Sequence, residues 1–286
     1  MTGTVLVFGR SGQVGAGLAR LPGVLALARA EADLADPDAC AAAIRAHSPV
    51  AVINAAAWTA VDAAEEQAEA AHRINAAAPG AMAQAAARLG VPFVHISTDY
   101  VFDGTGDRPW SPEDTPAPLG VYGRSKLAGE RAVQAAGGVH AILRTSWVFS
   151  GRGQNFLRTM LRLGAAREKL TVVADQIGGP TPADAIAAAC HAIAGRLGAE
   201  PELSGIHHFS GAPDVSWAGF ARAIMAAAGL SCSIEDIASD AWPTKAPRPR
   251  NSRLDCTGLT AAFGIPRPDW QAGVVAALAE LQETPT

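Results

Sequence analysis

A tyrosine and a lysine four residues apart are the side chains of this sequence best suited to joint chemistry. The chain holds two tyrosines and three lysines, and one of each forms the segment Tyr122-Gly-Arg-Ser-Lys126. Residues four apart share one face of a helix, so the Lys126 ammonium could lie beside the Tyr122 hydroxyl. There it would favour the ionised form and lower a tyrosine pKa that is about 10 when unperturbed, which suits a general acid at neutral pH. The alternative is a surface tyrosine with a solvated lysine one turn along.

A glycine-rich turn near the N-terminus is typical of a dinucleotide site. The segment Gly9-Arg-Ser-Gly-Gln-Val-Gly15 directly follows an apolar run, residues 4–8, and precedes an expected helix. The three glycines allow a tight turn and a close approach to a pyrophosphate, to which the helix N-terminus offers free N–H donors. The alternative is a turn that binds nothing. As a cofactor site, the turn predicts contacts from Gly9, Ser11, Gly12, Gln13, Val14 and Gly15.

The residues after the second apolar run bear on the choice of nicotinamide cofactor. This run ends near Arg29, where a residue that binds the ribose 2′-hydroxyl would be acidic. Arg29, together with Arg10 in the turn, could instead meet a 2′-phosphate, which favours NADPH over NADH. We expect Asp33 and Leu34 to touch the adenine. The alternative is that Arg29 is a solvated strand end and that NADH is the cofactor.

Short apolar runs alternate with Ala-rich stretches of helical character along the first half of the chain. Continuous apolar strands separated by helices indicate a buried parallel sheet that is covered on both faces. We therefore predict an α/β fold of the Rossmann type with a doubly wound parallel sheet. A helix should open at Asp36-Pro37, and another should end at Gly90. The expected strands are 4–8, 24–28, 50–54, 92–96 and 139–143.

The pattern becomes less regular after about residue 150. We predict that residues 1–149 and about 181–210 form a dinucleotide-binding domain, because a helix and a strand return the chain to the sheet. Residues 150–180 and 211–286 then form a smaller, mainly C-terminal substrate-binding lobe. The expected elements are helices near 156–166, 183–197 and 217–228 and a strand at 206–209.

Composition excludes several classes of protein. Of the 286 residues, 49% are hydrophobic and 17% are charged, which suits a full core and argues against disorder. The net charge of −4, without a basic cluster, argues against nucleic-acid binding. No apolar run reaches the ~20 residues of a membrane span, and a strand that begins almost at Met1 leaves no room for a signal peptide. Four scattered cysteines without a CxxC pair argue against structural zinc and fit a reducing compartment, so we expect a cytoplasmic protein.

Longer segments add a family resemblance to the glycine turn and the Tyr–Lys pair. They are Asn54-Ala-Ala-Ala-Trp-Thr-Ala-Val-Asp62, Ser97-Thr-Asp-Tyr-Val-Phe-Asp-Gly104, Arg144-Thr-Ser-Trp-Val148, Asp175-Gln-Ile-Gly-Gly-Pro-Thr181 and Arg248-Pro-Arg-Asn-Ser-Arg-Leu-Asp255. With these segments in this order, the chain resembles extended short-chain dehydrogenase/reductases and, among them, the dTDP-4-dehydrorhamnose reductases. The similar sugar-nucleotide dehydratases carry Thr-Asp-Glu where this chain has Thr98-Asp99-Tyr100, so the missing glutamate argues against dehydration.

The resemblance implies reduction of the C4 ketone of dTDP-4-dehydro-6-deoxy-L-mannose to dTDP-L-rhamnose, a step of cell-surface polysaccharide biosynthesis. Hydride would come from the nicotinamide, and Tyr122 would donate a proton to the developing alkoxide. Lys126 would support the acidity of Tyr122 and hold the nicotinamide ribose. Thr98 stands where the family's third catalytic residue polarises the carbonyl, with the capping of a strand end as the alternative.

The resemblance also implies further contacts. Asp99 would bond the sugar or tune Tyr122, with a structural Asx-turn as the alternative. Trp147 would contact the substrate, with a core tryptophan as the alternative. Asn75 would bond backbone near the site or stabilise the start of a helix. Two arginines, Arg248 and Arg253, would meet the nucleotide diphosphate or form surface ion pairs. The cofactor would also be lined by Ala57, Trp58, Thr59 and Ile96.

Some members of the family are homodimers that share a magnesium ion. No carboxylate set for such an ion stands out in this sequence, and Gly17 occupies a first-helix position where an acidic residue would contribute. We therefore assign no metal ligands and leave both magnesium and a homodimer open. Two alternative functions also stay open. One is a reductase of another sugar nucleotide, and the other is a non-catalytic dinucleotide-binding subunit like the one that regulates methionine adenosyltransferase.

Overall fold

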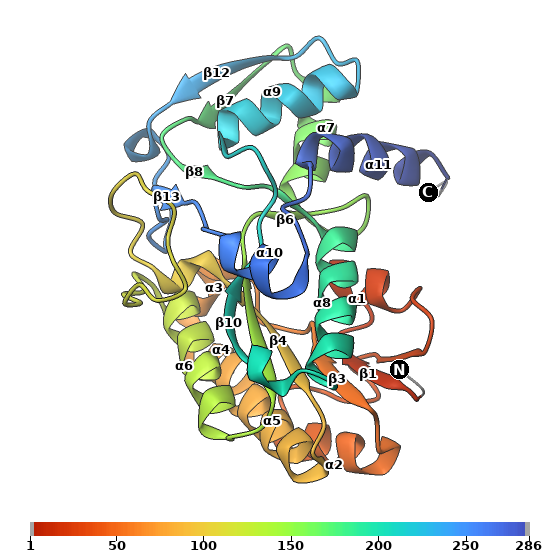
Figure 1. Cartoon of the computed structure of the whole chain (residues 1–286). Helices are drawn as coiled ribbons and strands as arrows, with labels where there is room; N and C mark the ends of the chain where they lie inside the picture. The colour runs from red at the N-terminus through yellow and green to blue at the C-terminus, as the bar shows by residue number, and fades with distance from the viewer. Residues whose placement is uncertain (1–2, 284–286) are drawn as a thin grey trace.

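Six parallel strands form the central sheet of the computed structural model, which describes residues 3–283 (Figure 1). Their order across the sheet is β10-β5-β4-β3-β1-β2. All six were predicted, but β4 and β5 each end two residues later than expected, which brings Thr98 and Thr145 to the carboxyl edge of the sheet. The strands are β1 (Val5–Phe8), β2 (Val24–Leu27), β3 (Ala51–Asn54), β4 (Phe93–Thr98), β5 (His140–Thr145) and β10 (Gly205–His208).

Helices cover both faces of this sheet. On one face lie α1 (Gln13–Leu18) and α8 (Ala183–Leu197), and on the other lie α2 (Pro37–His47), α5 (Ala78–Leu89) and α6 (Val121–Ala135). Alternate residues of β1 enter the two cores, because successive side chains of a strand point to opposite faces. The strand order reverses at β1, which pairs with both β2 and β3, and open α/β sheets bind ligands at the carboxyl ends beside such a point. The predicted doubly wound fold is confirmed.

Local signals determine the ends of several helices. The Asp36 side chain accepts a hydrogen bond from the Ala39 nitrogen at 3.0 Å, and Pro37 opens α2 as predicted. Gly90 ends α5 with a φ of +70°. Between β3 and α5 the chain forms three helical segments, of which only residues 76–77 were predicted to be helical. They are α3 (Val61–Glu66), α4 (Ala68–His72) and a π-helical turn (Arg73–Ala77).

A smaller lobe lies at the top of Figure 1, beyond the carboxyl edge of the sheet. Its core joins α7 (Phe156–Ala166), α9 (Trp217–Ala227) and α11 (Trp270–Glu283) with the parallel pair β7 (Lys169–Val173) and β12 (Ser233–Ile237). Predictions for α7, α8 and α9 hold to within one residue, whereas α11 was not predicted. Two-residue strands complete the connections between the parts: β6 (Val148–Phe149), β8 (Ile177–Gly178), β9 (Thr181–Pro182), β11 (Val215–Ser216) and β13 (Asn251–Ser252).

Helix α10 (Thr257–Phe263) lies in the stretch predicted for the lobe but packs elsewhere. Its Leu259 and Phe263 belong to the core between the sheet and α8. The sheet domain therefore recruits a helix from the C-terminal part of the chain. The division into a cofactor domain and a substrate lobe stays a prediction.

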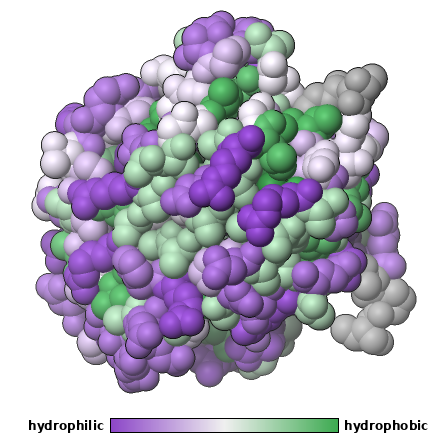
Figure 2. All heavy atoms as spheres, turned by 90° about the horizontal axis from the view of Figure 1, so that it is seen from below, coloured by the Kyte–Doolittle hydropathy of each residue, from purple (hydrophilic) through white to green (hydrophobic). Residues whose placement is uncertain are grey.

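Figure 2 shows the face at the bottom of Figure 1, where hydrophilic residues surround a pale hydrophobic area across the middle and a few more strongly hydrophobic residues above it. The exposed large hydrophobic side chains come from separate parts of the described chain: Leu25, Leu89, Leu119, Trp242 and Val275. Within residues 3–283, no helix is both long and apolar enough to cross a membrane.

Candidate active site

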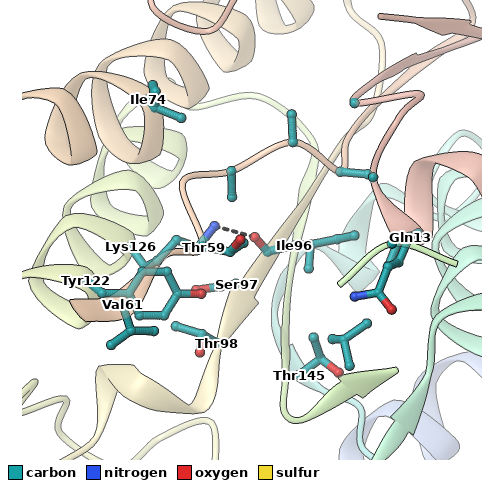
Figure 3. A pocket seen from close by; sticks show the side chains of 18 of the residues that line it. Gln13, Thr59, Val61, Ile74, Ile96, Ser97, Thr98, Tyr122, Lys126 and Thr145 are labelled. Carbon is teal, nitrogen blue, oxygen red and sulfur yellow. Dashed lines mark hydrogen bonds between the residues drawn. The ribbon is translucent and has the colours of Figure 1, made fainter. Parts of the chain in front are cut away.

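A cavity of about 740 Å³ opens at the carboxyl edge of the sheet. Its walls come from the segments that follow β1, β3, β4 and β5, from α6 and from the lobe (Figure 3). Six of the residues predicted for the site do not line it: Arg10, Gly15, Trp58, Asn75, Arg248 and Arg253. Those that do are Gly9, Ser11, Gly12, Gln13, Val14, Arg29, Asp33, Leu34, Ala57, Thr59, Ile96, Thr98, Asp99, Tyr122, Lys126 and Trp147.

The glycine turn folds the end of β1 tightly against the neighbouring strand. Gly9 has a φ of +100°, and a Cβ there would come within 2.9 Å of the Ala56 nitrogen. A Cβ on Gly15 would lie 1.9 Å from the Gly9 carbonyl oxygen, so Gly15 closes the helix onto the turn. Gly12 N donates to the same oxygen at 2.9 Å, and α1 begins at the next residue. The turn thus keeps its backbone close to the cavity.

The arginines predicted to meet a 2′-phosphate are ion-paired. Arg29 Nε lies 3.0 Å from Asp33 Oδ2, and the Arg29 side chain is 77% exposed. Asp33 also accepts from the Ala35 nitrogen, and this bond, with the one from Arg29, holds the Asp33 pKa below its usual range. Arg10 pairs with Glu31 at 3.4 Å. A 2′-phosphate would compete with Asp33 for Arg29, which the sequence analysis did not anticipate.

Close backbone packing brings α6 to the end of β4. A Cβ on Gly123 would lie 2.1 Å from the Tyr100 carbonyl oxygen, so a side chain there would push the first turn of α6 away. Likewise, a Cβ on Gly129 would lie 2.0 Å from the Asn75 carbonyl oxygen. These contacts, and not helix periodicity alone, place Tyr122 at the cavity.

Lys126 lies on the same face of α6 as Tyr122, but its ammonium binds elsewhere. Lys126 Nζ donates to the Ile96 carbonyl oxygen at 2.6 Å (Figure 3). It also lies 3.4 Å from His95 Nε2. Only 2% of the residue is exposed. Burial lowers the Lys126 pKa to about 8, against the raising effect of the Glu130 carboxylate.

The prediction that Lys126 lowers the pKa of Tyr122 is wrong. Burial raises the Tyr122 pKa to about 12, with a hydrogen bond to Thr98 acting against this shift and the charge of Asp99 adding to it. The physical reason is that desolvation disfavours the phenolate, while the ammonium is directed at Ile96. Tyr122 is therefore protonated at neutral pH, as a proton donor must be.

Polar residues at the ends of β4 and β5 line the cavity. Thr98 Oγ1 donates to Asp99 Oδ1 at 3.0 Å and accepts from the Tyr100 nitrogen at 3.2 Å. Asp99 Oδ2 and Thr145 Oγ1 are buried and have no hydrogen-bond partner among residues 3–283. Burial raises the Asp99 pKa to about 6, and the hydroxyls of Ser252 and Thr98 act against this rise. Because unpaired buried polar atoms are costly, the two orphaned oxygens fit a site that a polar ligand completes.

Two stacked tryptophans form the wall of the cavity nearest the lobe. The Trp147 and Trp217 rings have centroids 3.6 Å apart and an interplanar angle of 11°. Trp147 has a φ of +50°, which is rare for a bulky residue, and its carbonyl accepts from the Thr181 nitrogen at 3.1 Å. A Cβ on Gly178 would lie 2.8 Å from the Trp147 ring. The predicted Trp147 thus lies in the cavity wall rather than in the core.

Asn75 connects the loop after β3 to α6. Its Oδ1 accepts from the Trp58 nitrogen at 2.8 Å, and its Nδ2 donates to the Trp58 carbonyl oxygen and to Ser125 Oγ. Ser125 Oγ in turn donates to the Tyr122 carbonyl oxygen at 2.7 Å. Of the two roles considered for Asn75, the structure shows backbone bonding near the site. The Trp58 side chain takes no part in these bonds, because its indole nitrogen donates to the Ala60 carbonyl oxygen.

Known proteins are similar in sequence to this chain over nearly its full length. A family model described as the RmlD substrate binding domain matches residues 3–283. The dTDP-4-dehydrorhamnose reductase of Burkholderia thailandensis is 47% identical over 286 residues, covering 94% of this chain and 96% of that protein. The reductase of the same name from Sinorhizobium fredii is 46% identical over 254 residues, covering 87% and 86%. The chain belongs to the dTDP-4-dehydrorhamnose reductase family.

Solved structures of dTDP-4-dehydrorhamnose reductases share the whole architecture. The protein from Clostridium acetobutylicum superposes with a TM-score of 0.90 at 33% identity, covering 98% of this chain and 99% of its own. The protein from Bacillus anthracis, solved in complex with NADP, also has a TM-score of 0.90 at 31% identity, covering 98% and 100%. The motif resemblance therefore extends through the lobe.

Two arginines predicted to meet the substrate diphosphate lie outside the cavity of this dTDP-4-dehydrorhamnose reductase family member. Arg248 Nη2 pairs with Asp62 Oδ2 at 2.8 Å, and Arg253 Nη1 donates to Asn251 Oδ1 at 3.1 Å. Within residues 3–283, no group of three or more His, Cys, Asp or Glu side chains could hold a metal ion. A Cβ on Gly17 would lie 2.5 Å from Asp184 Oδ1, so α1 and α8 pack closely at that position.

The cavity also contains residues that the sequence analysis missed. Thr145 belongs to the Arg-Thr-Ser-Trp-Val segment quoted for the resemblance, so its place after an apolar strand was a usable signal. Trp217 and the stretch 153–155 come from parts of the chain with no recognised motif, and the fold alone brings them to the site.

Proposed function

We propose that this chain reduces the C4 ketone of dTDP-4-dehydro-6-deoxy-L-mannose to dTDP-L-rhamnose with NADPH. The observation that carries the proposal is the convergence of Tyr122, Lys126 and Thr98 on the cavity that also contains the glycine turn. The names of the relatives support the substrate, and the NADP complex of the Bacillus anthracis protein supports the cofactor.

The side chains around the cavity suit the reduction of a ketone. A bound nicotinamide cofactor would supply the hydride. Tyr122 would give its hydroxyl proton to the ketone oxygen, which becomes a hydroxyl group. Thr98 would donate a hydrogen bond to the same ketone oxygen. To do so, its hydroxyl has to give up the hydrogen bond that it donates to Asp99 Oδ1. Lys126, whose ammonium is held by the Ile96 carbonyl oxygen, would bind the hydroxyls of the nicotinamide ribose.

Substrate recognition in this proposal depends on the orphaned carboxylate and the tryptophan wall. Asp99 Oδ2 would accept a hydrogen bond from a sugar hydroxyl, because it is buried without a partner among the described residues. Trp147 would pack on the substrate. The preference for NADPH over NADH depends on Arg29, which would have to exchange Asp33 for a 2′-phosphate. The cytoplasmic location stays a prediction, and a homodimer stays open.

The test is turnover of the freshly prepared ketosugar nucleotide by purified protein, followed by the loss of NADPH absorbance and by identification of the product with NMR. Rapid oxidation that yields dTDP-L-rhamnose is the expected result. Faster oxidation with another 4-keto sugar nucleotide would reassign the substrate. Tight NADPH binding with no oxidation on any such substrate would contradict the proposal and favour a non-catalytic binding subunit.

A further inference from the structure

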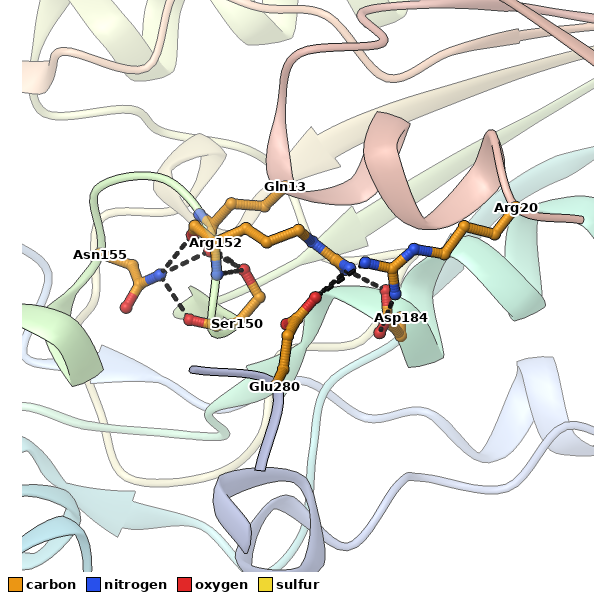
Figure 4. A network of polar contacts seen from close by, with 7 residues as sticks. All are labelled: Gln13, Arg20, Ser150, Arg152, Asn155, Asp184 and Glu280. Carbon is orange, nitrogen blue, oxygen red and sulfur yellow. Dashed lines mark hydrogen bonds and ion pairs between the residues drawn. The ribbon is translucent and has the colours of Figure 1, made fainter. Parts of the chain in front are cut away.

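A charged cluster beside the cavity attaches the loop formed by residues 150–155 to two helices (Figure 4). Arg152 Nη1 lies 2.5 Å from Glu280 Oε1 of α11, and Arg152 Nη2 binds Asp184 Oδ1 of α8. Arg20, at the end of α1, pairs with the same two carboxylates, at 2.8 Å from Glu280 and 3.8 Å from Asp184. Both arginines share the carboxylates, but only Arg152 belongs to the loop.

The loop also lies directly against α11. A Cβ on Gly151 would come within 2.7 Å of the Ala277 carbonyl oxygen, so the backbone of the loop touches the backbone of the helix. The Arg152 side chain is 19% exposed, and its Nε is buried without a hydrogen-bond partner among residues 3–283. Because this nitrogen is buried, the Arg152 guanidinium depends on its two carboxylate partners.

Backbone groups determine the orientation of two side-chain amides in this region. The Arg158 nitrogen donates to Asn155 Oδ1 at 3.1 Å, which leaves Asn155 Nδ2 as a donor. Asn155 Nδ2 donates to Gln13 Oε1 at 2.8 Å and to the carbonyl oxygens of Ser150 and Arg152. Ser150 Oγ also donates to Gln13 Oε1, at 2.8 Å. The loop therefore holds the oxygen end of the Gln13 amide.

Gln13 consequently presents its nitrogen end to the cavity, as Figure 3 shows. Gln13 lines the cavity next to the glycine turn, and so do Gly153 and Asn155 of the loop. An amide nitrogen with two hydrogens is a suitable donor for an anionic oxygen. Arg152 does not line the cavity, so any influence on a ligand has to pass through the loop.

We propose that Arg152 is a positioning residue for the diphosphate of the cofactor. By holding the loop on Asp184 and Glu280, it keeps Ser150 and Asn155 in place, and these keep the Gln13 nitrogen directed at a diphosphate oxygen. The inference rests on the proposed function for the identity of the cofactor. It adds a binding role for the Gln13 side chain and a dependence of cofactor affinity on a residue that the cofactor does not touch.

The test is a titration of NADPH with the full-length protein, in the absence of the sugar nucleotide, followed by nucleotide fluorescence. Arg152→Met should raise the NADPH Kd about tenfold, and Gln13→Glu, which keeps the oxygen acceptors but loses the donor, should raise it about tenfold or more. Arg20→Met is the matched control, because Arg20 pairs with the same carboxylates without belonging to the loop, and its Kd should stay within about twofold of wild type. In turnover, the KM for NADPH of Arg152→Met should rise more than its kcat falls.

Limited proteolysis of the unliganded protein gives a second readout. Cleavage within residues 150–155 should be faster in Arg152→Met than in wild type and unchanged in Arg20→Met. An unchanged Kd in Arg152→Met or Gln13→Glu, or an equal loss in Arg20→Met, would overturn the inference while leaving the proposed function intact. A wild-type protein that binds neither NADPH nor NADH would overturn both.

Discussion

The Lys126 ammonium donates a hydrogen bond to the Ile96 carbonyl oxygen at 2.6 Å, and among residues 3–283 it makes none to the Tyr122 hydroxyl. The lysine is nearly fully buried, and burial lowers its pKa to about 8. At neutral pH the protein therefore carries a charge that its surroundings disfavour. Functional sites commonly keep such groups at the expense of stability.

Replacing Lys126 with methionine should stabilise the fold and abolish turnover. Since the folded pKa is about 8 and the ordinary value is 10.5, the unfolded chain binds more protons between these values. The free energy of unfolding of wild type should then rise as pH increases from about 8 to about 10.5. Over this range the difference in stability between Lys126→Met and wild type should become smaller. At pH 7 we expect the variant to be more stable by roughly 1–3 kcal/mol. Urea unfolding at several pH values checks this, and a variant that is less stable at pH 7 would contradict it.

Replacing Asp99 with asparagine should stabilise the protein near neutral pH and weaken substrate binding. The folded pKa of about 6 lies above the ordinary value of 3.8. The contribution of Asp99 to stability is therefore fully present below about pH 3.8 and is lost as pH rises through about 6. Asp99→Asn should exceed wild type in stability at pH 7 but not at pH 4, and its KM for the sugar nucleotide should rise about tenfold. Asp107→Asn, on an exposed loop, is the control, and the same pH dependence there would contradict the assignment.

The strands and the main helices could be predicted because their signals are local. Runs such as Val5–Phe8 are apolar on both faces, as a central parallel strand must be. The segment from Val61 to Asn75 could not be predicted, because two helices of five and six residues and a π-helical turn carry too few residues for a periodic pattern. The placement of α10 on the sheet domain depends on long-range packing that no local pattern encodes.

The site could be predicted where a residue's role is tied to its position in a motif. The glycine turn, Thr98 and Tyr122 follow strand ends or open helices, and all meet at one cavity. The direction of the Lys126 ammonium could not be predicted, because it depends on the Ile96 carbonyl of another element. The stacking of Trp217 on Trp147 likewise arises only when the lobe folds back.

Replacing Arg29 with alanine should lower the affinity for NADPH more than that for NADH. Arg29 is exposed and already pairs with Asp33. We therefore expect the affinity to fall by about threefold to tenfold for NADPH and by less than about twofold for NADH. Asp33→Asn should shift the preference in the opposite direction, since it releases Arg29. Dissociation constants for both nucleotides check this, and an equal loss for both in Arg29→Ala would exclude a contact with the 2′-phosphate.

The role of Tyr122 as proton donor is tested most directly by single-turnover reduction of the ketosugar nucleotide with Tyr122→Phe, alongside its NADPH Kd. The variant keeps the ring and loses only the hydroxyl, so cofactor binding should stay within about twofold of wild type. The rate should fall by about a hundredfold to ten-thousandfold, the range expected for the loss of a general acid. A rate close to that of wild type, with NADPH bound equally well, would contradict the assignment of Tyr122 as the proton donor.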